Sequence, residues 1–246
     1  MKKFFVCALA ALSFTACVNE DGLLSESKGY INLNVNTEES VNVTRGTVSS
    51  TATDWYVKVN SDDAITVAAL ASKAYTAKTN NTLTAYNYAN MDAALTANDG
   101  RGAAYWTGTS SAFDIIAGQT ANVEVNCGKA QNAAFAVVFN ETFTNVAAEG
   151  YKVTAVSGTR SLVFNATNTS EVYFNPAEIT YTITATVNGK TVNVSKDITL
   201  AAGTKTTLTV KANTNGTISL SITYDDMTNE SKEITIDAAT GAEATE

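Results

Sequence analysis

The chain has 246 residues and a formal charge of -8, with 16 Lys plus Arg against 24 Asp plus Glu, and this acidic balance excludes a basic nucleic-acid binder because it repels phosphate. It contains 0 His, which removes the commonest general base, the commonest transition-metal ligand and every nucleophile pair that needs a histidine. A hydrophobic content of 45% with only 16% charged residues is too apolar for a disordered chain.

The first residues are typical of a secretory signal. Lys2 and Lys3 form a short positive region, and residues 4–14 are almost entirely apolar, over a length that is too short to span a bilayer. Small residues then lead into Cys17. This pattern resembles a bacterial lipobox, in which the signal is cut before the cysteine and the cysteine is lipidated on its thiol and amine. We therefore expect a signal peptide over residues 1–16, with an ordinary secretory cleavage site as the alternative.

An acylated Cys17 would anchor the mature chain to a membrane without spanning it. Several acyl chains on one cysteine bind a bilayer firmly, and no later segment approaches the roughly 20 apolar residues that a spanning helix needs. Glu20 and Asp21 follow, and acidic residues at this place resemble the surface-export signal of Bacteroidetes lipoproteins, with a solvated tether as the alternative. We expect a lipid-anchored tether over residues 17–28 and an outer-membrane lipoprotein exposed at the cell surface.

The use of cysteine agrees with that location. Cys7 lies in the signal and Cys17 at its end, so only Cys127 remains in the body of the chain and no internal disulfide can form. Cys127 alternates with Val123 and Val125, which predicts a small buried apolar side chain. No activating neighbour accompanies it, so we expect no catalytic thiol.

Alternation of apolar and polar residues with a period of two recurs along the body and predicts β-strands. In the first run, Ile31, Leu33 and Val35 fall on one side and asparagines on the other. The predicted strands cover residues 30–36, 55–60, 82–88, 113–116, 121–127, 133–139, 151–156, 161–164, 171–174, 179–187, 191–200, 205–211, 217–224 and 232–236.

Turn residues separate the C-terminal strands. Asn188 and Gly189 sit between two alternating runs and are a strong hairpin signal, and residues 201–203 and 213–216 also tolerate positive φ. An Ala-rich run over residues 64–77 can form a short helix. We expect a loop with a helical turn over residues 90–100.

The strands are too many for one small sandwich, so two antiparallel β-sandwich domains that abut are the simpler interpretation. We place the N-terminal domain at residues 29–128 and the C-terminal domain at residues 129–237, because residues 128–131 lie near the middle without a marked linker. A small acidic tail over residues 238–246 is expected to fray. The predicted fold class is therefore all-β.

Catalytic motifs are absent from the sequence, which has neither a phosphate-binding glycine loop nor a nucleophile elbow. Carboxylate pairs that could serve a glycosidase occur only at residues 38–39, 62–63 and 225–226, each in a polar stretch typical of a solvated turn. The oxygen-bearing side chains of residues 225–230 do not have the spacing of a calcium loop. We expect no enzyme activity, no cofactor and no metal site; a carboxylate-based hydrolase is the weakest alternative.

Aromatic residues near the predicted loops are the remaining candidates for a binding site. Tyr88, Tyr105 and Trp106 could contact a ligand, either as a platform for a sugar or as a protein contact, and packing in a sandwich core is the alternative. Residues 98–102 are expected to form an exposed loop, in which Arg101 could pair with an acidic partner.

Residues 102–133 carry more than alternation. Their distinctive features are an aromatic pair before Gly108, a Phe-x-Ile strand from Phe113, a Gly-x-Thr turn at Gly118, a Val-x-Val-x-Cys run that ends at Cys127, and Asn132. This arrangement resembles the DUF4493 family of Bacteroidales lipoproteins, with further matches at residues 162–164 and 172–174. The resemblance covers about residues 29–236. The family's function is unknown, so the resemblance implies a location and a fold.

A lipoprotein signal, a first strand and two β-sandwich domains are also, more distantly, similar to the layout of fimbrillin (type V pilus) proteins, which implies fimbrillin/transthyretin-like sandwiches. In fimbrillins a trypsin-like protease cuts after an arginine and removes the first strand, and a neighbouring subunit's strand fills the groove. The resemblance places such a cut between Arg45 and Gly46. A solvated loop at Arg45 is the alternative, and an unprocessed anchor, tip or stand-alone surface protein fits equally well.

These observations favour a non-catalytic, lipid-anchored cell-surface protein with an adhesion or surface-assembly role, such as a fimbria-like subunit or anchor. The expected partners are membrane lipid through acylated Cys17, and either other surface or pilus proteins by strand addition or glycans. Nucleic acid is not expected. A surface glycan-binding module is the alternative, and exposed aromatic side chains in a row on one face would distinguish it.

Overall fold

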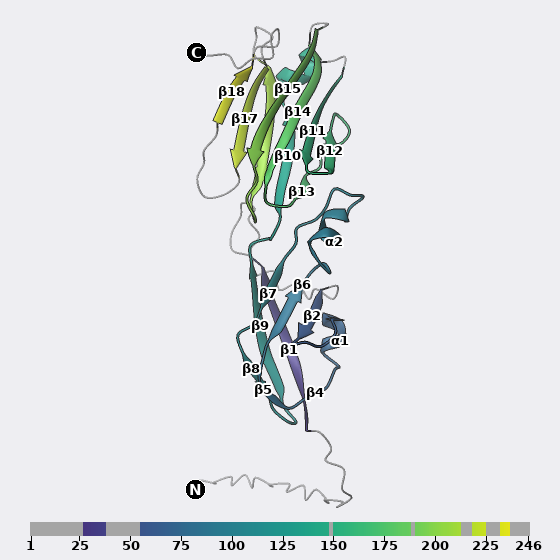
Figure 1. The fold of residues 1–246 in the computed structure, drawn as a ribbon, viewed down its shortest axis with the longest axis vertical. Helices are drawn as coiled ribbons and strands as arrows, with labels where there is room; N and C mark the ends of the chain where they lie inside the picture. The colour runs from purple at the N-terminus through teal and green to yellow at the C-terminus, as the bar shows by residue number, and fades with distance from the viewer. Residues whose placement is uncertain are drawn as a thin grey trace, which may run out of the picture.

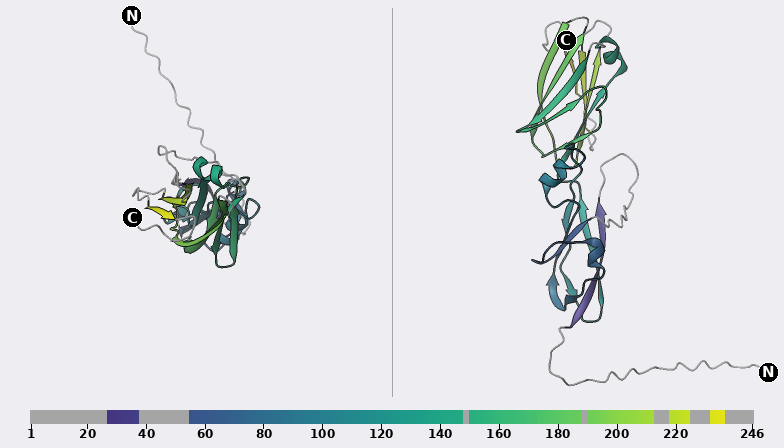
Figure 2. Two further views of the ribbon diagram at one scale, coloured as in Figure 1. Left: turned by 90° about the horizontal axis from the view of Figure 1, so that it is seen from above. Right: turned by 90° about the vertical axis from the view of Figure 1, so that its right-hand side faces the viewer.

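The computed structural model describes residues 27–37, 55–147, 150–187, 190–212, 218–224 and 232–236. These residues form an elongated body, long in two views and narrow when seen along its axis (Figures 1 and 2). Its first strand, β1 (Lys28–Thr37), begins at one end of the long axis, and the C-terminal strands lie at the other end. Cys17, Arg45, Gly46, the Asn188–Gly189 turn and the acidic tail lie outside the described residues.

The N-terminal half is built from short strands around β1 and one long strand near its end. The other strands are β2 (Tyr56–Val59), β3 (Ile65–Thr66), β4 (Tyr75–Thr76), β5 (Lys78–Asn81), β6 (Leu83–Tyr86), β7 (Thr107–Thr109), β8 (Phe113–Ile115) and β9 (Thr120–Gly128). They form sheets in the orders β4-β1-β9, β3-β2-β6-β7 and β5-β8. Two short helices, α1 (Val67–Leu70) and α2 (Met91–Thr96), connect strands in this half.

The strands β1 and β9 run parallel, and their register explains why both alternate so regularly. Leu33 lies opposite Val123 and Val35 opposite Val125, so the apolar residues of both strands face the same side. On the other face the Asn36 side-chain amide donates to the Asn126 side-chain oxygen at 2.9 Å. Strand alternation thus places one polar and one apolar face on this pair of strands.

The C-terminal half has two larger sheets. Its strands are β10 (Ala133–Phe139), β11 (Tyr151–Ser157), β12 (Arg160–Phe164), β13 (Val172–Phe174), β14 (Glu178–Val187), β15 (Lys190–Thr199), β16 (Lys205–Ala212), β17 (Ile218–Tyr224) and β18 (Lys232–Ile236). The sheet orders are β13-β10-β16-β17-β18 and β12-β11-β14-β15. Helix α3 (Glu141–Val146) follows β10, and β10 pairs parallel with β16.

The buried apolar side chains of the two halves form two separate clusters. One cluster joins β1 and β9 to β2 and β6 in the N-terminal half, with Val57, Leu83 and Val125 at 0% exposure. The other fills the space between the sheets of the C-terminal half around Phe135 and Tyr181, both fully buried. Each half therefore has a hydrophobic core of its own. The domain boundary between residues 128 and 129 stays a prediction.

The structure confirms the predicted all-β fold class with several antiparallel sheets. The parallel pairs β1–β9 and β10–β16 depart from the all-antiparallel expectation, because alternation fixes which side of a strand is buried and not which strand lies beside it. Helix α1 occupies only four residues of the Ala-rich run. Helix α3 was not expected; Asn140 caps it by accepting a hydrogen bond from the Thr142 N–H at 3.0 Å.

Candidate functional site

A groove lies where the two halves of the chain meet, and it is the best candidate for a binding site. Its volume is about 480 Å³. One wall comes from the residues after β6 and from the segment between α2 and β7, and the other comes from the residues that lead into β13. The side chains that matter for its chemistry are Asn87, Tyr88, Arg101, Trp106, Glu171 and Tyr173.

The loop after α2 carries Arg101 to the groove. Asn98, Asp99 and Gly100 all have positive φ, at 52°, 54° and 80°. The Asn98 side-chain amide donates to the Gly102 carbonyl at 2.9 Å, and the Gly102 N–H donates to the Ala97 carbonyl at 2.8 Å. Asn, Asp and Gly are the residues that tolerate this left-handed backbone, so the local sequence fixes a tight loop with Arg101 at its tip.

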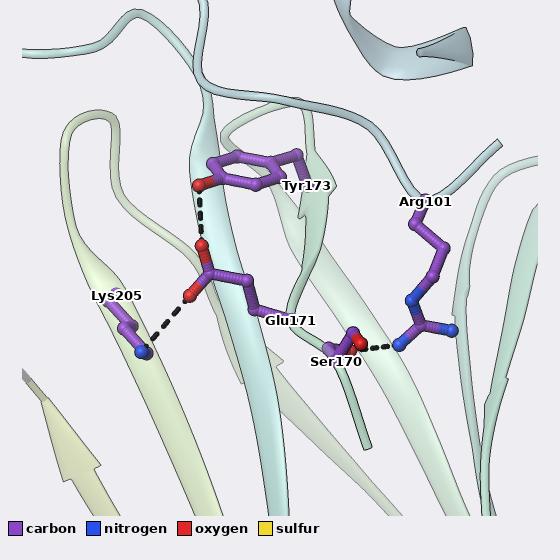
Figure 3. A network of polar contacts seen from close by, with 5 residues as sticks. All are labelled: Arg101, Ser170, Glu171, Tyr173 and Lys205. Carbon is purple, nitrogen blue, oxygen red and sulfur yellow. Dashed lines mark hydrogen bonds and ion pairs between the residues drawn. The ribbon is translucent and has the colours of Figure 1, made fainter. Parts of the chain in front are cut away.

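Arg101 reaches from the N-terminal half onto the C-terminal half. Its Nη2 donates to the Ser170 backbone carbonyl, as Figure 3 shows. The guanidinium carbon lies 5.1 Å from the centre of the Phe164 ring. In addition, the Tyr173 N–H donates to the Arg101 carbonyl at 2.9 Å. Burial lowers the pKa of Arg101, because the charged guanidinium loses part of its hydration.

Arg160 makes the reciprocal contact from the C-terminal half. Its Nη2 donates to the Gly100 carbonyl at 2.7 Å, and its Nε donates to the Tyr173 carbonyl at 3.1 Å. Its guanidinium carbon lies 5.6 Å from the centre of the Phe174 ring. Burial also lowers the pKa of Arg160. The two arginines therefore fasten the two halves together through carbonyl groups and aromatic rings.

Glu171 is the carboxylate of the groove, and it already has partners. It accepts a hydrogen bond from the Tyr173 hydroxyl at 2.7 Å and forms an ion pair with Lys205 at 3.0 Å (Figure 3). Burial would raise the pKa of Glu171, but the bonds from Tyr173 and Lys205 outweigh it, so the pKa lies below its usual value. Glu171 is therefore a paired carboxylate and not a poised general acid.

Two asparagines hold the aromatic segment of the groove in place. The Asn87 side-chain oxygen accepts a hydrogen bond from the backbone N–H of Trp106 at 2.9 Å, and its side-chain amide donates to the Ala104 carbonyl at 2.8 Å. Asn132, which is 1% exposed, accepts from the Tyr105 N–H at 2.9 Å and donates to the Ala103 carbonyl at 2.7 Å. Because Asn132 immediately precedes β10, these bonds also join the two halves of the chain.

Two N–H groups of the groove residues have no acceptor among the described residues. They are Arg101 Nε and Trp106 Nε1, and both atoms are buried. Most buried donors in folded proteins are paired, because a buried donor without an acceptor costs about 1–3 kcal/mol. Both atoms belong to residues that line the groove.

The structure brings two of the three predicted aromatic ligand contacts to the groove. Tyr88 and Trp106 line it. Tyr105 lies instead beside Tyr86, whose pKa is raised by burial and further by Tyr105 and Tyr56. The rings of Tyr56 and Tyr86 are nearly parallel, with centres 5.9 Å apart. A ligand role for any of these residues stays a prediction, as do the roles given to Cys17, Arg45 and Gly46, which lie outside the described residues.

The sequence analysis gave no role to Arg160 or Glu171; it placed Arg101 in an exposed loop, where it could pair with an acidic partner. No local signal could have found them, because Arg101 and Arg160 lie far apart in the sequence and contact each other's half only after folding. The residues around Arg101 that tolerate positive φ indicate a fixed loop, but they do not indicate which part of the chain this loop contacts.

Other candidate chemistry in the described part of the chain is sparse. Cys127 is buried, and burial raises its pKa to about 11, which keeps it a protonated thiol. Asp62 and Asp63 are exposed side by side in a turn. Within the described ranges, no three residues of the His, Cys, Asp and Glu types gather in a way that could hold a metal ion. Nor does any described helix have the length and apolar character needed to cross a membrane.

The fold and the groove define a class: an elongated all-β protein with two hydrophobic cores and a polar, aromatic junction between them. Residues 27–239 match the family described as Domain of unknown function (DUF4493), and the chain belongs to this family. The resemblance of residues 102–133 to that family is thereby confirmed. No curated protein matches the sequence.

Two of the solved structures to which the chain is similar come from Bacteroides species. A suspected cell adhesion protein from Bacteroides ovatus is similar at 14% identity, with 82% of this chain and 98% of that chain covered and a TM-score of 0.46. A suspected cell adhesion protein from Bacteroides uniformis is similar at 10% identity, with 82% and 100% covered and a TM-score of 0.43.

Proposed function

We propose that the protein is a non-catalytic, lipid-anchored cell-surface protein with a role in adhesion or surface assembly. The observation that carries the proposal is the position of Lys28, where β1 begins at one end of the elongated body (Figure 1). A chain held by acylated Cys17 would enter the body at that end, only a short tether away. The C-terminal strands, at the other end of the body, would then point away from the membrane.

The chemistry of the groove supports a binding role over a catalytic one. Glycoside hydrolysis needs two carboxyl groups that face each other across a bond. Glu171 is the groove's carboxylate and is engaged by Tyr173 and Lys205. The asparagines of the groove are engaged by backbone groups. The polar side chains therefore fix the junction, and the described residues that line the groove include no acid and base pair.

Strand addition is the form of assembly that the proposal includes for a processed chain, with Arg45–Gly46 as its processing site. Such a cut would release Cys17 together with β1, so the lipid anchor belongs to the unprocessed chain. Strand β1 pairs with β9 along nearly its whole length and buries Ile31 and Val35 in the N-terminal core. Cleavage followed by loss of β1 would expose the edge of β9 and uncover part of that core. An uncovered edge of this kind attracts another strand, so a neighbouring subunit's strand could take the place of β1.

Intact-mass and N-terminal analysis of the protein from its native membrane tests both parts of this proposal. A chain that starts at an acylated Cys17 would support the anchor. A chain that starts at Gly46 would support processing and strand addition. A mature chain without lipid that begins elsewhere would overturn both.

Glycan binding is the second candidate function, and the observation that favours it is the presence of Tyr88 and Trp106 in one groove. Aromatic rings with a few oriented polar groups are typical of small-molecule sites, which occur preferentially at domain interfaces. A glycan array with the unaltered protein and with Tyr88→Ala and Trp106→Ala tests this candidate. Absence of binding to any sugar by the unaltered protein would count against it.

A further inference from the structure

We propose that the groove between the two halves binds an acidic saccharide, such as a uronic acid or sialic acid, through its carboxylate. Arg101 would pair with the carboxylate and Trp106 would contact the sugar. The inference rests on the second candidate function, glycan binding. It adds the chemical class of the sugar and the residue that binds its carboxylate.

Positive charge at the junction favours an anionic ligand. Arg101 and Arg160 both lie at the junction, and their guanidinium groups donate to backbone carbonyls. Within the described residues, neither forms an ion pair with a carboxylate, whereas Glu171 is already paired with Lys205. The junction is thus a local excess of positive charge in a chain whose net charge is -8. Arg is the side chain best suited to binding a carboxylate through two parallel bonds.

Two buried donors of the groove residues favour a ligand that brings acceptors. Arg101 Nε and Trp106 Nε1 have no acceptor in the described part of the chain. The acceptor oxygen of Asn87 is taken by the Trp106 backbone, and one oxygen of Glu171 is taken by the Tyr173 hydroxyl. A ligand that fits this wall must bring acceptors, and a small shift of the Arg101 and Trp106 side chains would expose their donors to it. A carboxylate brings only acceptors.

The size and the aromatic surface of the groove favour a ring-shaped ligand. A groove of about 480 Å³ lies within the range of about 300–1,000 Å³ that is typical of small-molecule sites. Tyr88 and Trp106 give it aromatic surface beside Arg101. This combination favours a ring-shaped acidic ligand over a bare inorganic anion, which has no apolar face to place on an aromatic ring.

Isothermal titration of the full chain, purified in detergent, tests the proposal with matched probes. The acidic probes are trigalacturonate and sialyllactose. Their neutral partners are fully methyl-esterified trigalacturonate and lactose. A triglutamate peptide serves as a carboxylate without a sugar ring. We expect at least one acidic sugar to bind at least about tenfold more tightly than its neutral partner, as one charge-assisted bond implies.

Three variants separate recognition from folding. Arg101→Gln removes the cation from the groove and should weaken binding of the acidic sugar about tenfold. Arg160→Gln is the matched control, because it loosens the same junction while Arg160 does not line the groove; it should change the affinity by less than about threefold. Trp106→Phe keeps an aromatic side chain and removes the unpaired N–H, so it should weaken binding of the acidic sugar. Because Trp106 also packs against the N-terminal core, the thermal midpoint of this variant is measured beside its affinity.

Several results would overturn the proposal. They are absence of binding by both acidic sugars up to about 10 mM, equal binding of acidic and neutral probes, equal loss in Arg101→Gln and Arg160→Gln, or binding of triglutamate as tight as that of the sugars. Preference for galacturonate or for sialyllactose would support the proposal and identify the source of the carboxylate. The lipid anchor is judged separately by the mass of the N-terminus, so failure of sugar binding leaves the surface proposal intact.

Discussion

Asn132 is the residue on which the junction depends most directly. Its side chain is almost fully buried and pairs with the Tyr105 N–H and the Ala103 carbonyl. Asn132→Ala would leave both groups without a partner, so we expect a loss of about 1–3 kcal/mol in the free energy of unfolding. Urea denaturation measures it. The exposed Asn122→Ala on β9 is the control and should stay within about 0.5 kcal/mol of the unaltered protein.

Glu171 gives the junction a defined dependence on pH. Its pKa lies below the usual value in the folded state, so its contribution to stability is complete above the unfolded pKa, about 4.3, and is lost as the pH falls through the folded pKa. The ion pair is about one-third exposed, so this contribution should be below about 1 kcal/mol. In urea denaturation between about pH 7 and pH 3, Glu171→Gln should lose less stability than the unaltered protein. Equal losses in both proteins would contradict the prediction; exposed Glu178→Gln is the control.

Cys127 should be inert in the folded protein. Burial raises its pKa to about 11, and only the thiolate reacts with alkylating agents. We expect iodoacetamide at about pH 8 to leave the peptide that contains Cys127 unmodified in the native protein and to modify it fully in denaturant. Mass spectrometry of the digested chain measures both. Rapid modification of the native protein would show that the core around β9 opens easily.

At the scale of elements, the sequence predicts strands well and their neighbours poorly. The runs that begin at Ile31 and Ala133 alternate or are continuously apolar, and both form strands. Strands β9 and β16 were also predicted, but their parallel pairing with β1 and β10 could not be. A parallel pair has no hairpin turn to connect it and depends on contacts between segments that are distant in the sequence. For the same reason only part of the groove could be predicted. Tyr88 and Trp106 were candidates because they are aromatic, whereas Arg160 and Glu171 gain their roles only from their positions in the folded chain.

Strand β7 packs so closely on β9 that it requires a glycine. A Cβ added to Gly108 would lie 2.7 Å from the Asn126 carbonyl oxygen and 3.0 Å from the Cys127 Cα. These are backbone atoms of β9 and cannot rotate away, so Gly108→Ala should destabilise the protein by about 1–3 kcal/mol. Thermal unfolding measures the effect. Thr109→Ala, next in the strand and exposed, should shift stability by no more than about 0.5 kcal/mol; similar losses in both would contradict the close approach.

At the scale of the whole molecule, the junction decides whether the two cores act as one stiff body. Each half buries its own apolar cluster, so the halves need not hold each other folded. Among the described residues, polar contacts at Arg101, Asn132 and Arg160 join them, together with the bond from the Gln131 N–H to the Tyr105 carbonyl. Small polar interfaces between domains usually permit relative motion. We therefore expect the bonds of the two half-buried guanidinium groups to set the stiffness of the elongated body.

Removal of both arginine contacts should make the body flexible without unfolding it. In the double variant Arg101→Gln, Arg160→Gln, loss of two charge-assisted bonds should raise the population of bent orientations at least about tenfold. Small-angle X-ray scattering should then show a broader distribution of maximum dimensions, while far-ultraviolet circular dichroism stays unchanged because both cores remain intact. Thr180→Ala, which removes only the surface bond to Asp197, is the control and should scatter like the unaltered protein. An unchanged scattering curve for the double variant would show that packing around β10, and not the arginines, makes the body stiff.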